Sequence, residues 1–334
     1  MSDDRILLAH GSGGKVSHRL ITEFFLKTFD DPALKKQDDA AVITGAGRLA
    51  FTTDSYVVKP VFFPGGDIGK LAVCGTVNDL AMSGAAPKYV SAGFIIEEGF
   101  PFTDLKKIIE SMAKAAREAG VAIVTGDTKV VEKGSADEIY INTAGIGLIG
   151  EGVEISGGNI RPGDILILSG SLGDHGMAVM SRREGLTFGT EVVSDCAPLN
   201  GLVSEVLASG ATVRALRDPT RGGLAGTLNE FADQSGVTIT IDETSVPIKE
   251  QVLGACEMLG LDPFQVANEG KAVAVVAPAD SAKALAVMRR SPYGREAAVI
   301  GEASVGKPRV LMRTMIGTTR ILDMLIGEQL PRIC

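Results

Sequence analysis

The chain has 334 residues, of which 45% are hydrophobic and 22% charged, so it can bury a large core and is not expected to be disordered as a whole. Its net charge of −8 argues against nucleic acid or an anionic membrane surface as the main partner. No signal peptide or transmembrane-length apolar run is evident. The four cysteines are far apart and the histidines number three, which argues against a zinc site and favours a reduced, cytoplasmic protein.

The first half of the chain alternates strand and helix patterns. A helical stretch is expected from Thr103, as its cap, to Gly120, because apolar residues recur there at spacings of three and four. Another helix is expected over Gly69–Ala81. The expected strands lie at Val42–Ile43, Leu49–Thr53, Tyr89–Ile96, Val121–Thr125 and Ile139–Ile149.

Two glycine-rich stretches imitate nucleotide-binding motifs. His10-Gly11-Ser12-Gly13-Gly14-Lys15 fails as a P-loop, because Ala9 replaces the first glycine and Val16 follows the lysine. It can still be a loop that wraps an anion, or a plain flexible arm. Gly145-Ile146-Gly147-Leu148-Ile149-Gly150 lies inside a predicted strand with no helix after it, so we expect these glycines to relieve crowding within a sheet.

A domain boundary is expected near Ser156-Gly157-Gly158-Asn159. The second half repeats the alternation of strands and helices, which predicts an α/β (α+β) protein of two similar domains. The expected parts are residues 1–155, residues 156–313 and a C-terminal tail, residues 314–334. Helices are expected at His175–Arg183, Leu199–Ala208, Gly222–Gln234 and Pro247–Leu259. Strands are expected at Ile165–Ser169, Thr238–Ile241, Ala272–Val276, Ala297–Ile300 and Arg309–Met312.

Five acids of the first half lie beside predicted strand ends or turns: Asp38, Asp39, Asp54, Asp79 and Asp127. Each alone is also typical of an ordinary cap or turn residue. Acids gathered in one place would repel one another unless a cation lay between them. Magnesium prefers a few carboxylates together with ligand phosphates, so a magnesium site is predicted if the five converge.

The second half carries the stretch Asp218-Pro219-Thr220-Arg221-Gly222-Gly223. Two glycines that open a helix leave free amides at the positive end of its dipole, which can bind an anion, and Arg221 can hold a phosphate or carboxylate. A simple capping motif is the alternative. Glu269 in a turn, Lys129 after a strand and His175 at a helix start each have a plain structural alternative as well.

The chain ends in Pro331-Arg332-Ile333-Cys334. A terminal thiol can swing into a pocket that an internal thiol cannot reach, so Cys334 is either a substrate handle or an exposed cysteine on a frayed tail. Proline stiffens such a tail, and Arg332 is expected to dock on acidic walls.

Taken in order, these motifs carry a resemblance. His10-Gly11, Asp38-Asp39, Thr53-Asp54, Asn78-Asp79, Gly126-Asp127-Thr128 and Asp218 to Gly223 resemble the superfamily of ATP-using enzymes that includes aminoimidazole ribonucleotide synthetase and selenophosphate synthetase. Within it, Gly173-Asp174-His175-Gly176, Asn268-Glu269-Gly270-Lys271 and the C-terminal tail resemble the HypE family of hydrogenase maturation factors. The resemblance covers essentially the whole chain.

The resemblance implies a two-domain aminoimidazole ribonucleotide synthetase-like fold, with a mixed sheet packed by helices in each domain and a flexible C-terminal tail. It implies an ATP-dependent carbamoyl dehydratase that acts on itself. In this family HypF carbamoylates the terminal cysteine, ATP drives dehydration of the S-carboxamide to a thiocyanate, and the cyanide passes to iron on a HypC–HypD complex. The family fold also implies a homodimer, with ATP bound near the interface of the first domains.

Carried onto this chain, the resemblance implies three groups of site residues. Cys334, Lys129 and Glu269 are the expected catalytic residues, without a decision on which of Lys129 and Glu269 is acid or base. The expected metal ligands, for Mg²⁺, are Asp38, Asp39, Asp54, Asp79 and Asp127. The expected ATP-binding residues are His10, Gly11, Gly13, Gly14, Asp39, Thr53, Asn78, Gly126, Asp218 and Arg221.

Two other functions fit parts of the pattern. Another superfamily member could be a synthetase or kinase of a free small molecule, but such an enzyme has no use for a terminal cysteine. A non-catalytic carrier could present a modified thiol to a partner, but a carrier needs no acid-rich metal site.

Overall fold

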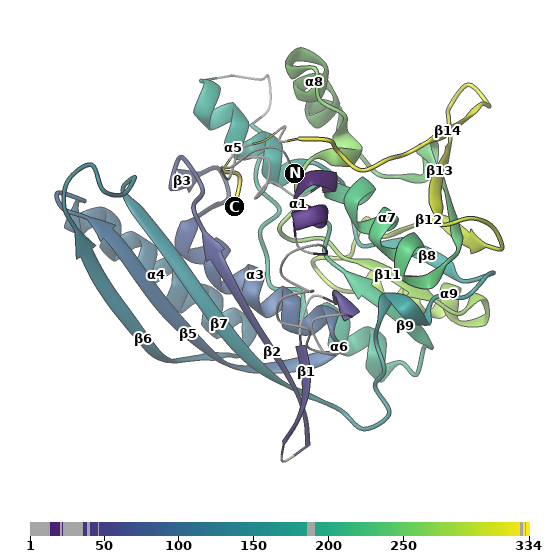
Figure 1. Cartoon of the computed structure of the whole chain (residues 1–334), viewed down its shortest axis with the longest axis horizontal. Coiled ribbons are helices and arrows are strands. Elements are labelled where there is room, and N and C mark those ends of the chain that lie inside the picture. The colour runs from purple at the N-terminus through teal and green to yellow at the C-terminus, as the bar shows by residue number, and fades with distance from the viewer. Residues whose placement is uncertain are drawn as a thin grey trace.

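The computed structural model describes residues 14–20, 22, 36–38, 41–45, 47–185, 191–327, 330 and 332–334. Its two large β-sheets are separated by the segment between Ile149 and Ile165. The first sheet, with its helices, lies at the left of Figure 1 and the second at the right. No helix among the described residues is long and apolar enough to span a membrane.

The first sheet has five strands in the order β1-β2-β7-β5-β6. Only β5 and β6 run parallel to each other. The strands are β1 (Ala41–Gly45), β2 (Gly47–Tyr56), β5 (Ala85–Glu97), β6 (Ala122–Val131) and β7 (Ile139–Ile149). A short hairpin of β3 (Phe62–Phe63) and β4 (Gly66–Asp67) follows β2, and α1 (Gly14–Leu20) precedes β1.

Helix α3 (Ile68–Met82) lies at the centre of the molecule. It contacts β2, β5 and β7 on one side and α4 (Phe102–Ala119) and α6 (Asn200–Ala208) on others. A helix enclosed in this way must be apolar nearly all round, and 13 of its 15 residues are buried. Its first turn is capped by Asp67, whose carboxylate accepts hydrogen bonds from the backbone N–H groups of Gly69 and Lys70 at 2.8 and 3.1 Å.

The second sheet has seven strands in the order β14-β13-β10-β12-β8-β11-β9, with β10 and β13 parallel. They are β8 (Ile165–Leu168), β9 (Val213–Arg217), β10 (Thr238–Asp242), β11 (Val273–Val276), β12 (Ala298–Ser304), β13 (Arg309–Arg313) and β14 (Thr319–Ile321). The helices of this half are α5 (Asp174–Glu184), α6, α7 (Gly223–Ser235), α8 (Glu250–Leu259) and α9 (Ser281–Met288).

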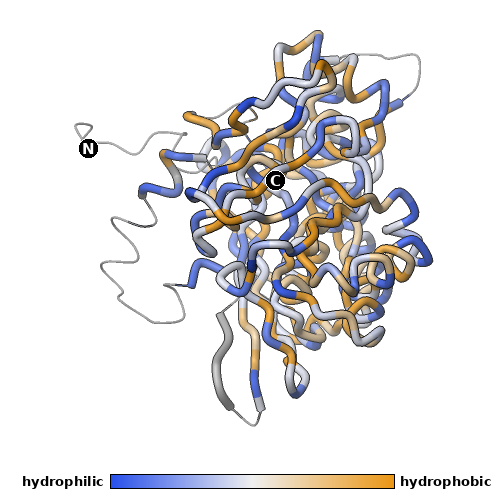
Figure 2. The backbone as a smooth tube through the Cα atoms, turned by 90° about the vertical axis from the view of Figure 1, so that its right-hand side faces the viewer, coloured by the Kyte–Doolittle hydropathy of each residue, from blue (hydrophilic) through white to orange (hydrophobic). Residues whose placement is uncertain are grey.

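Both faces of the second sheet are covered. Leu166 and Leu168 pack into one apolar cluster with α7, while Ile167 between them packs into another with α6 and α9. Successive side chains of a strand point to opposite faces, so a sheet buried on both sides needs continuous apolar runs. Apolar segments accordingly run through the body of the molecule in Figure 2, where they are coloured orange.

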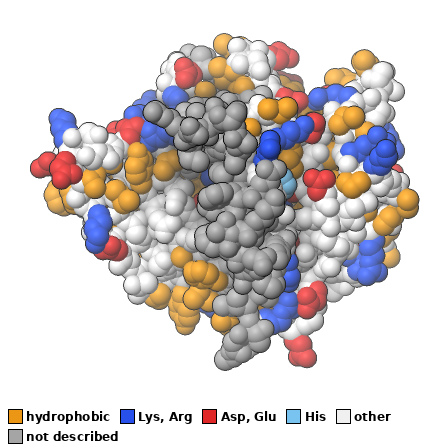
Figure 3. All heavy atoms as spheres, in the orientation of Figure 1, with side chains coloured by type: hydrophobic (Ala, Val, Ile, Leu, Met, Phe, Trp, Pro, Cys, Tyr) orange, Lys and Arg blue, Asp and Glu red, His pale blue; other side chains and the backbone are white. Residues whose placement is uncertain are grey.

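One face of the first sheet is apolar but uncovered. In β7 the residues alternate, with buried Ile141 and Gly145 toward α3 and exposed Ile146 and Leu148 on the other side. The exposed apolar residues on this face are Phe51, Tyr89, Ile95, Ile146 and Leu148. Orange side chains over the first sheet are visible at the left of Figure 3.

The structure confirms most predicted elements and corrects three. Helix α4 begins at Phe102 after Pro101, so Thr103 lies in its first turn and does not cap it. Strand β6 continues through Gly126 and Lys129 to Val131, although it was expected to end at Thr125. The second sheet extends to Ile321 through β14, so part of the expected tail belongs to this sheet. β9 and α9 were not predicted.

The glycines within β7 relieve crowding, as the sequence predicts. A Cβ on Gly145 would lie 2.7 Å from Thr76 and 2.9 Å from Leu80, both of α3. Thr76 cannot move freely, because its hydroxyl is hydrogen-bonded to that of Thr143 at 2.6 Å.

We therefore expect Gly145→Ala to lower the free energy of unfolding by about 1–3 kcal/mol, through overpacking between β7 and α3. Gly201→Ala is the matched control, because a Cβ on Gly201 meets nothing within 4 Å, and its effect should stay within about 0.5 kcal/mol. Denaturant unfolding of both variants measures the difference. Equal stability of the two would contradict this account of the β7–α3 contact.

Candidate functional site

The C-terminal residues lie between the two domains and are hydrogen-bonded to both; this region is called the cleft below. The N–H of Val57 donates to the carbonyl of Cys334 and that of Lys59 donates to the carbonyl of Arg332, each at 3.2 Å. This pairing has the register of an antiparallel ladder that continues β2 beyond Tyr56. The C-terminus is marked in Figure 1, near β3 and α5.

Only one side of this ladder consists of backbone hydrogen bonds. The carbonyls of Val57 and Lys59 accept instead from two guanidinium groups, Nε of Arg332 at 2.9 Å and Nε of Arg183 at 2.8 Å. Arg183 also donates to the carbonyl of Arg332 at 2.8 Å. The tail is thus held in place by side chains as much as by strand pairing.

Arg332 docks on an acid of the first domain, as expected. Its guanidinium forms an ion pair with Asp137 and lies over the ring of Tyr140, 5.8 Å from the ring centroid. Asp137 also binds Lys59 at 2.7 Å. Hydrogen bonds from Lys59 and then Arg332 hold the pKa of Asp137 below its ordinary value. The tail therefore carries its own anchor one residue before its apolar end.

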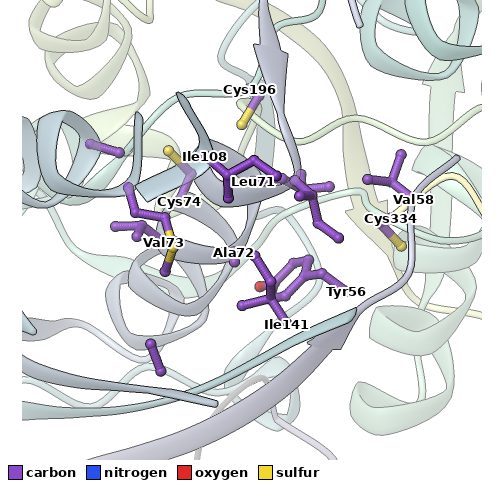
Figure 4. Packing of buried hydrophobic residues seen from close by; sticks show 14 of the residues in the cluster. Tyr56, Val58, Leu71, Ala72, Val73, Cys74, Ile108, Ile141, Cys196 and Cys334 are labelled. Carbon is purple, nitrogen blue, oxygen red and sulfur yellow. The ribbon is translucent and has the colours of Figure 1, made fainter. Parts of the chain in front are cut away.

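The tail ends in apolar surroundings. Ile333 and Cys334 are only 3% and 8% exposed and belong to the core cluster of the first domain, beside Tyr56 and Val58 (Figure 4). The Nη1 atom of Arg221 lies 3.6 Å from the Cys334 sulfur. Burial raises the pKa of the Cys334 thiol to about 12, Arg221 opposes that rise, and Glu269 and Asp54 add to it. The docked thiol is therefore uncharged at neutral pH.

Glu269 is a buried acid of this cleft. Burial first, and then the charges of Cys196, Asp218 and Asp54, raise its pKa well above the ordinary value. Its Oε1 atom has no hydrogen-bond partner among the described residues. Burial thus favours the protonated form of Glu269, which is the form able to deliver a proton to a neighbouring group.

Asp54 and Asp79 face the same region. Burial raises the pKa of the enclosed Tyr56 hydroxyl, and the charges of Asp54 and Asp79 raise it further. Thr52 donates to Asp79 at 2.8 Å, which orients that carboxylate. Two half-buried carboxylates near one another suit Mg²⁺, which needs only one or two together with phosphate oxygens. No group of three or more His, Cys, Asp or Glu side chains among the described residues is arranged to hold a metal ion.

The other predicted metal ligands lie elsewhere. Asp38 accepts from Ser156 at 3.2 Å and lies beside Arg217, at the edge of the second domain. Asp127 is on the exposed edge strand β6, separated from β2 by β5 and β7, and is paired with Lys129 at 2.8 Å. Asp39 lies outside the described residues. The five acids thus do not form one cluster within the described part of a single chain.

The predicted ATP-binding residues are also dispersed. Thr53 donates to the Thr143 carbonyl within the sheet, and Gly126 allows β6 to approach Ala92 closely. Gly14 opens α1 with a φ of 70°, and a Cβ on it would lie 2.3 Å from the Leu325 carbonyl. Asp218 is buried at the start of the Gly222–Gly223 turn. His10, Gly11 and Gly13 lie outside the described residues.

Asn78 corrects one prediction. It is fully buried, and its side-chain amide donates to the carbonyls of Ala197 and Glu269 at 3.1 and 3.3 Å and accepts from the N–H of Leu199 at 2.8 Å. All of these partners are backbone groups of the second domain. Asn78 therefore joins the domains and positions the Glu269 turn, and it does not face a nucleotide.

Three residues around the tail were not assigned a role from the sequence. Arg183 and Tyr56 lie in none of the motifs, and His175 was named only within a family motif, with a helix-start residue as its alternative. Only the folded chain brings them to the tail, because their partners lie more than a hundred residues away. Their roles depend on contacts that no local pattern encodes.

The chain matches two family models over most of its length. The model for the N-terminal domain of AIR synthase related proteins matches residues 37–149, and the model for their C-terminal domain matches residues 161–312. Among curated relatives, the chain is 56% identical to a carbamoyl dehydratase HypE of Cupriavidus necator, over 99% of this chain and 95% of that one. It is 47% identical to the carbamoyl dehydratase HypE of Escherichia coli, over 99% of this chain and all of that one.

Solved structures agree with this similarity. A chain from a HypE–HypF complex superposes with a TM-score of 0.88 at 54% identity, covering 92% of this chain and 99% of that one. The hydrogenase maturation protein HypE in complex with ATP superposes with a TM-score of 0.84 at 51% identity, covering 99% and 100%. A thiamine monophosphate kinase from Aquifex aeolicus, 17% identical with a TM-score of 0.66, shares the fold.

The raised pKa of Glu269 predicts a pH-dependent effect of Glu269→Gln on stability. Below the ordinary carboxyl pKa, the glutamate is protonated in both the folded and the unfolded state, and its titration contributes no difference. Above it the unfolded state loses the proton while the folded state keeps it, which destabilises the wild type by up to about 1.4 kcal/mol per pH unit.

Glu269→Gln should therefore gain stability relative to wild type as pH rises above the ordinary carboxyl pKa of about 4.3, until the folded-state carboxyl itself ionises. Thermal unfolding of both proteins across this range measures the gap. A gap that stays constant or closes with rising pH would show that Glu269 is ionised in the folded protein.

Proposed function

The chain belongs to the HypE family of carbamoyl dehydratases, and we propose that the docked tail, Glu269 and Arg221 are the parts with which it carries out this reaction. It is an ATP-dependent dehydratase that converts the S-carboxamide of its own Cys334 to a thiocyanate. The reaction supplies cyanide for the iron of [NiFe]-hydrogenase. The observation that supports the proposed site is the insertion of Cys334 beside Arg221 and the buried acid Glu269.

The chemistry explains the need for ATP. An amide oxygen is a very poor leaving group, so the carboxamide oxygen must first be phosphorylated. Phosphate then departs as the amide N–H protons are removed, leaving the nitrile of the thiocyanate. Carboxamide and ATP are thus converted to thiocyanate, ADP and phosphate, and the oxygen lost from the tail leaves in the phosphate.

The residues around Cys334 suit this sequence of proton and charge changes. The Arg221 cation, 3.6 Å from the sulfur, is placed to stabilise negative charge on the activated oxygen. Glu269 holds its proton in a buried position and can exchange it with the carboxamide. Burial of the tail excludes water, which would otherwise hydrolyse the activated intermediate.

Asp54 and Asp79 are the residues that we propose for Mg²⁺, since they are the two predicted ligands that meet at the cleft. The metal would offset the charge of the ATP phosphates. The Gly222–Gly223 turn opens α7, whose first N–H groups can bind phosphate oxygens, although the N–H of Gly223 itself is taken by the Thr220 carbonyl at 2.9 Å. Gly223 has a φ of 60°, and a Cβ there would meet backbone atoms of Phe264, Gln265 and Val266 at 2.7 Å.

The docked tail is suited to dehydration and unsuited to loading. Thiols react as thiolates, and burial keeps the docked Cys334 protonated. We propose that HypF carbamoylates Cys334 while the tail is outside the cleft, as the HypE–HypF complex of a relative suggests. Release of the tail would again expose the thiocyanate, to a HypC–HypD complex. The use of ATP favours the cytoplasm as the compartment.

We also propose a homodimer that pairs the uncovered faces of the first sheets. Phe51, Ile146 and Tyr89 are neighbours across β2, β7 and β5, so their exposed side chains form one apolar row. A soluble monomer rarely leaves such a face open. Lys129, with its side chain 69% exposed, lies on β6 at the edge of this sheet. From that edge it would act on the tail of the other chain.

Neither alternative function accounts for the cleft. A synthetase of a free small molecule has no need for a tail docked at Arg221 and Glu269. A thiol carrier has no need for a protonated acid beside the thiol. The family to which the chain belongs makes the dehydratase the function that both observations support.

The function predicts a mass change at the terminal cysteine. After carbamoylation by HypF, incubation with Mg-ATP should lower the mass of the C-terminal peptide by about 18 Da, the mass of one water. Glu269→Gln should bind ATP normally yet dehydrate at least about tenfold more slowly, the size typical of losing a proton-transfer group. ATP hydrolysis by carbamoylated wild type without this mass loss would refute the proposal.

The dimer predicts complementation between two inactive variants. Lys129→Ala keeps its tail but lacks the lysine, and Cys334→Ala keeps the lysine but has no substrate. If Lys129 acts on the partner's tail, mixing the two chains should restore dehydration on the Lys129→Ala chains, up to about half of wild type. Mixed dimers without activity would place Lys129 in its own chain's site or outside the reaction, and size-exclusion chromatography with light scattering checks that mixed dimers form.

A further inference from the structure

The side chain of His175 is hydrogen-bonded to the residue next to the reacting cysteine and has no role in the reaction proposed above. It lies in the first turn of α5 and is completely buried. Its Nε2 atom is 2.8 Å from the carbonyl oxygen of Ile333, and its Nδ1 atom is 2.8 Å from Oγ of Ser194. The ring meets Phe63 edge-on, with centroids 5.3 Å apart.

The neighbours of the imidazole determine which nitrogen carries the proton. A carbonyl oxygen can only accept, so Nε2 must be the donor to Ile333. Ser194 Oγ already accepts the N–H of Cys196 at 3.1 Å, which leaves its own hydrogen free for Nδ1. The result is a neutral imidazole with both nitrogens satisfied. Burial, which lowers the pKa of His175, agrees with the neutral form.

Ser194 is itself fixed from the first domain. Its backbone N–H donates to the Pro64 carbonyl at 2.9 Å, in the turn between β3 and β4. Gly65 in that turn has a φ of 91°, and a Cβ on it would lie 2.9 Å from backbone atoms of Ser194. The position of the proton on the His175 ring therefore depends on the Ser194 hydroxyl, and Ser194 is held in place by the turn at Pro64 and Gly65.

The carbonyl that His175 binds belongs to the peptide bond between Ile333 and Cys334. A planar peptide turns as a unit, so a hydrogen bond to this oxygen sets the direction of the Cys334 side chain. The backbone bonds from Val57 and Lys59 reach the carbonyls of Cys334 and Arg332 but leave that of Ile333 to His175. The other described hydrogen bonds to the tail carbonyls come from backbone N–H groups and from the Arg183 guanidinium. The bond to the Ile333 carbonyl comes from the neutral, buried side chain of His175.

We infer that His175 is a positioning residue for the dehydration. Its side chain recognises the inserted tail through the Ile333 carbonyl and aims Cys334 at Arg221. The Ser194 hydroxyl keeps the imidazole proton of His175 on Nε2. The inference rests on the proposed function and adds the element that selects the inserted over the released tail. Loss of one such bond is worth about 0.5–1.5 kcal/mol, or roughly two- to tenfold in the docking equilibrium.

The test is the rate at which iodoacetamide alkylates Cys334 in full-length, uncarbamoylated protein without ATP, read by mass spectrometry of the C-terminal peptide. In His175→Leu, which has no donor, alkylation should be about two- to tenfold faster than in wild type. His175→Gln keeps an N–H near the position of Nε2 and should restore slow alkylation. Ser194→Ala should give an intermediate rate, because Nδ1 loses its donor.

Ser181→Ala is the matched control. It removes a buried hydroxyl from the same helix, whose bond goes to the Met177 carbonyl at 2.6 Å and not to the tail, and it should leave alkylation unchanged. Folded His175→Leu with the wild-type rate, or His175→Gln as fast as His175→Leu, would overturn the inference. If His175→Leu does not fold, Ser194→Ala and His175→Gln decide, and a wild-type rate in Ser194→Ala counts against it.

A second measurement connects the His175–Ile333 hydrogen bond to catalysis. In single-turnover dehydration of carbamoylated protein, His175→Leu should slow the reaction of the docked tail, because Cys334 is no longer aimed at Arg221, with ATP affinity unchanged. If carbamoylated wild-type protein shows no loss of water with Mg-ATP, the proposed dehydratase function is refuted. The alkylation ratios would still test whether the His175–Ile333 hydrogen bond holds the tail. Faster alkylation with an unchanged dehydration rate would overturn the positioning role.

Discussion

A single buried amide, that of Asn78, fixes the geometry on which the cleft depends. It extends from the central helix α3 of the first domain and binds three backbone groups of the second, at Ala197, Leu199 and Glu269. Buried amide groups are costly to leave unpaired, so the domains can satisfy this side chain only in one relative position. That position brings the Glu269 turn over the end of β2, where the tail enters.

The tail is held by an incomplete set of strand hydrogen bonds, together with side-chain contacts and the burial of its last two residues. A complete strand would have had backbone bonds in both directions, but guanidinium groups occupy the carbonyls of Val57 and Lys59. Arg332 is anchored at the partly exposed Asp137, where an ion pair contributes little net energy in water. The apolar end, Ile333 and Cys334, supplies the burial. A substrate attached to its own enzyme needs this balance, because it must be loaded and unloaded elsewhere.

Burial also determines which form of each titratable group in the cleft is favoured. Burial favours the neutral forms of the Cys334 thiol, Glu269 and His175, and Arg221 is the cation beside the sulfur. Groups that are uncharged in the resting state can gain or lose protons when the carboxamide is activated. The carboxylates suited to magnesium, Asp54 and Asp79, are half-buried at the rim, where a phosphate can approach them.

The sequence by itself determined the elements whose causes are local. The apolar periodicity of α4, the continuous runs of β8 and β11 and the glycines of β7 report which faces are buried, and these were predicted close to their observed bounds. Motifs in their order sufficed for the family, the fold and the terminal cysteine as substrate. Two boundaries were wrong for different reasons. Thr103 resembles a cap, but the helix already begins at Phe102 after Pro101, which is a local effect. The strand expected to end at Thr125 continues to Val131, because β5 pairs with it along that length. Only the tertiary structure decided that Asn78 joins domains, that the predicted acids separate into different regions, and that His175, Arg183 and Val57 receive the tail. Those contacts join residues more than a hundred positions apart, and spacing along a chain carries no information about such distances.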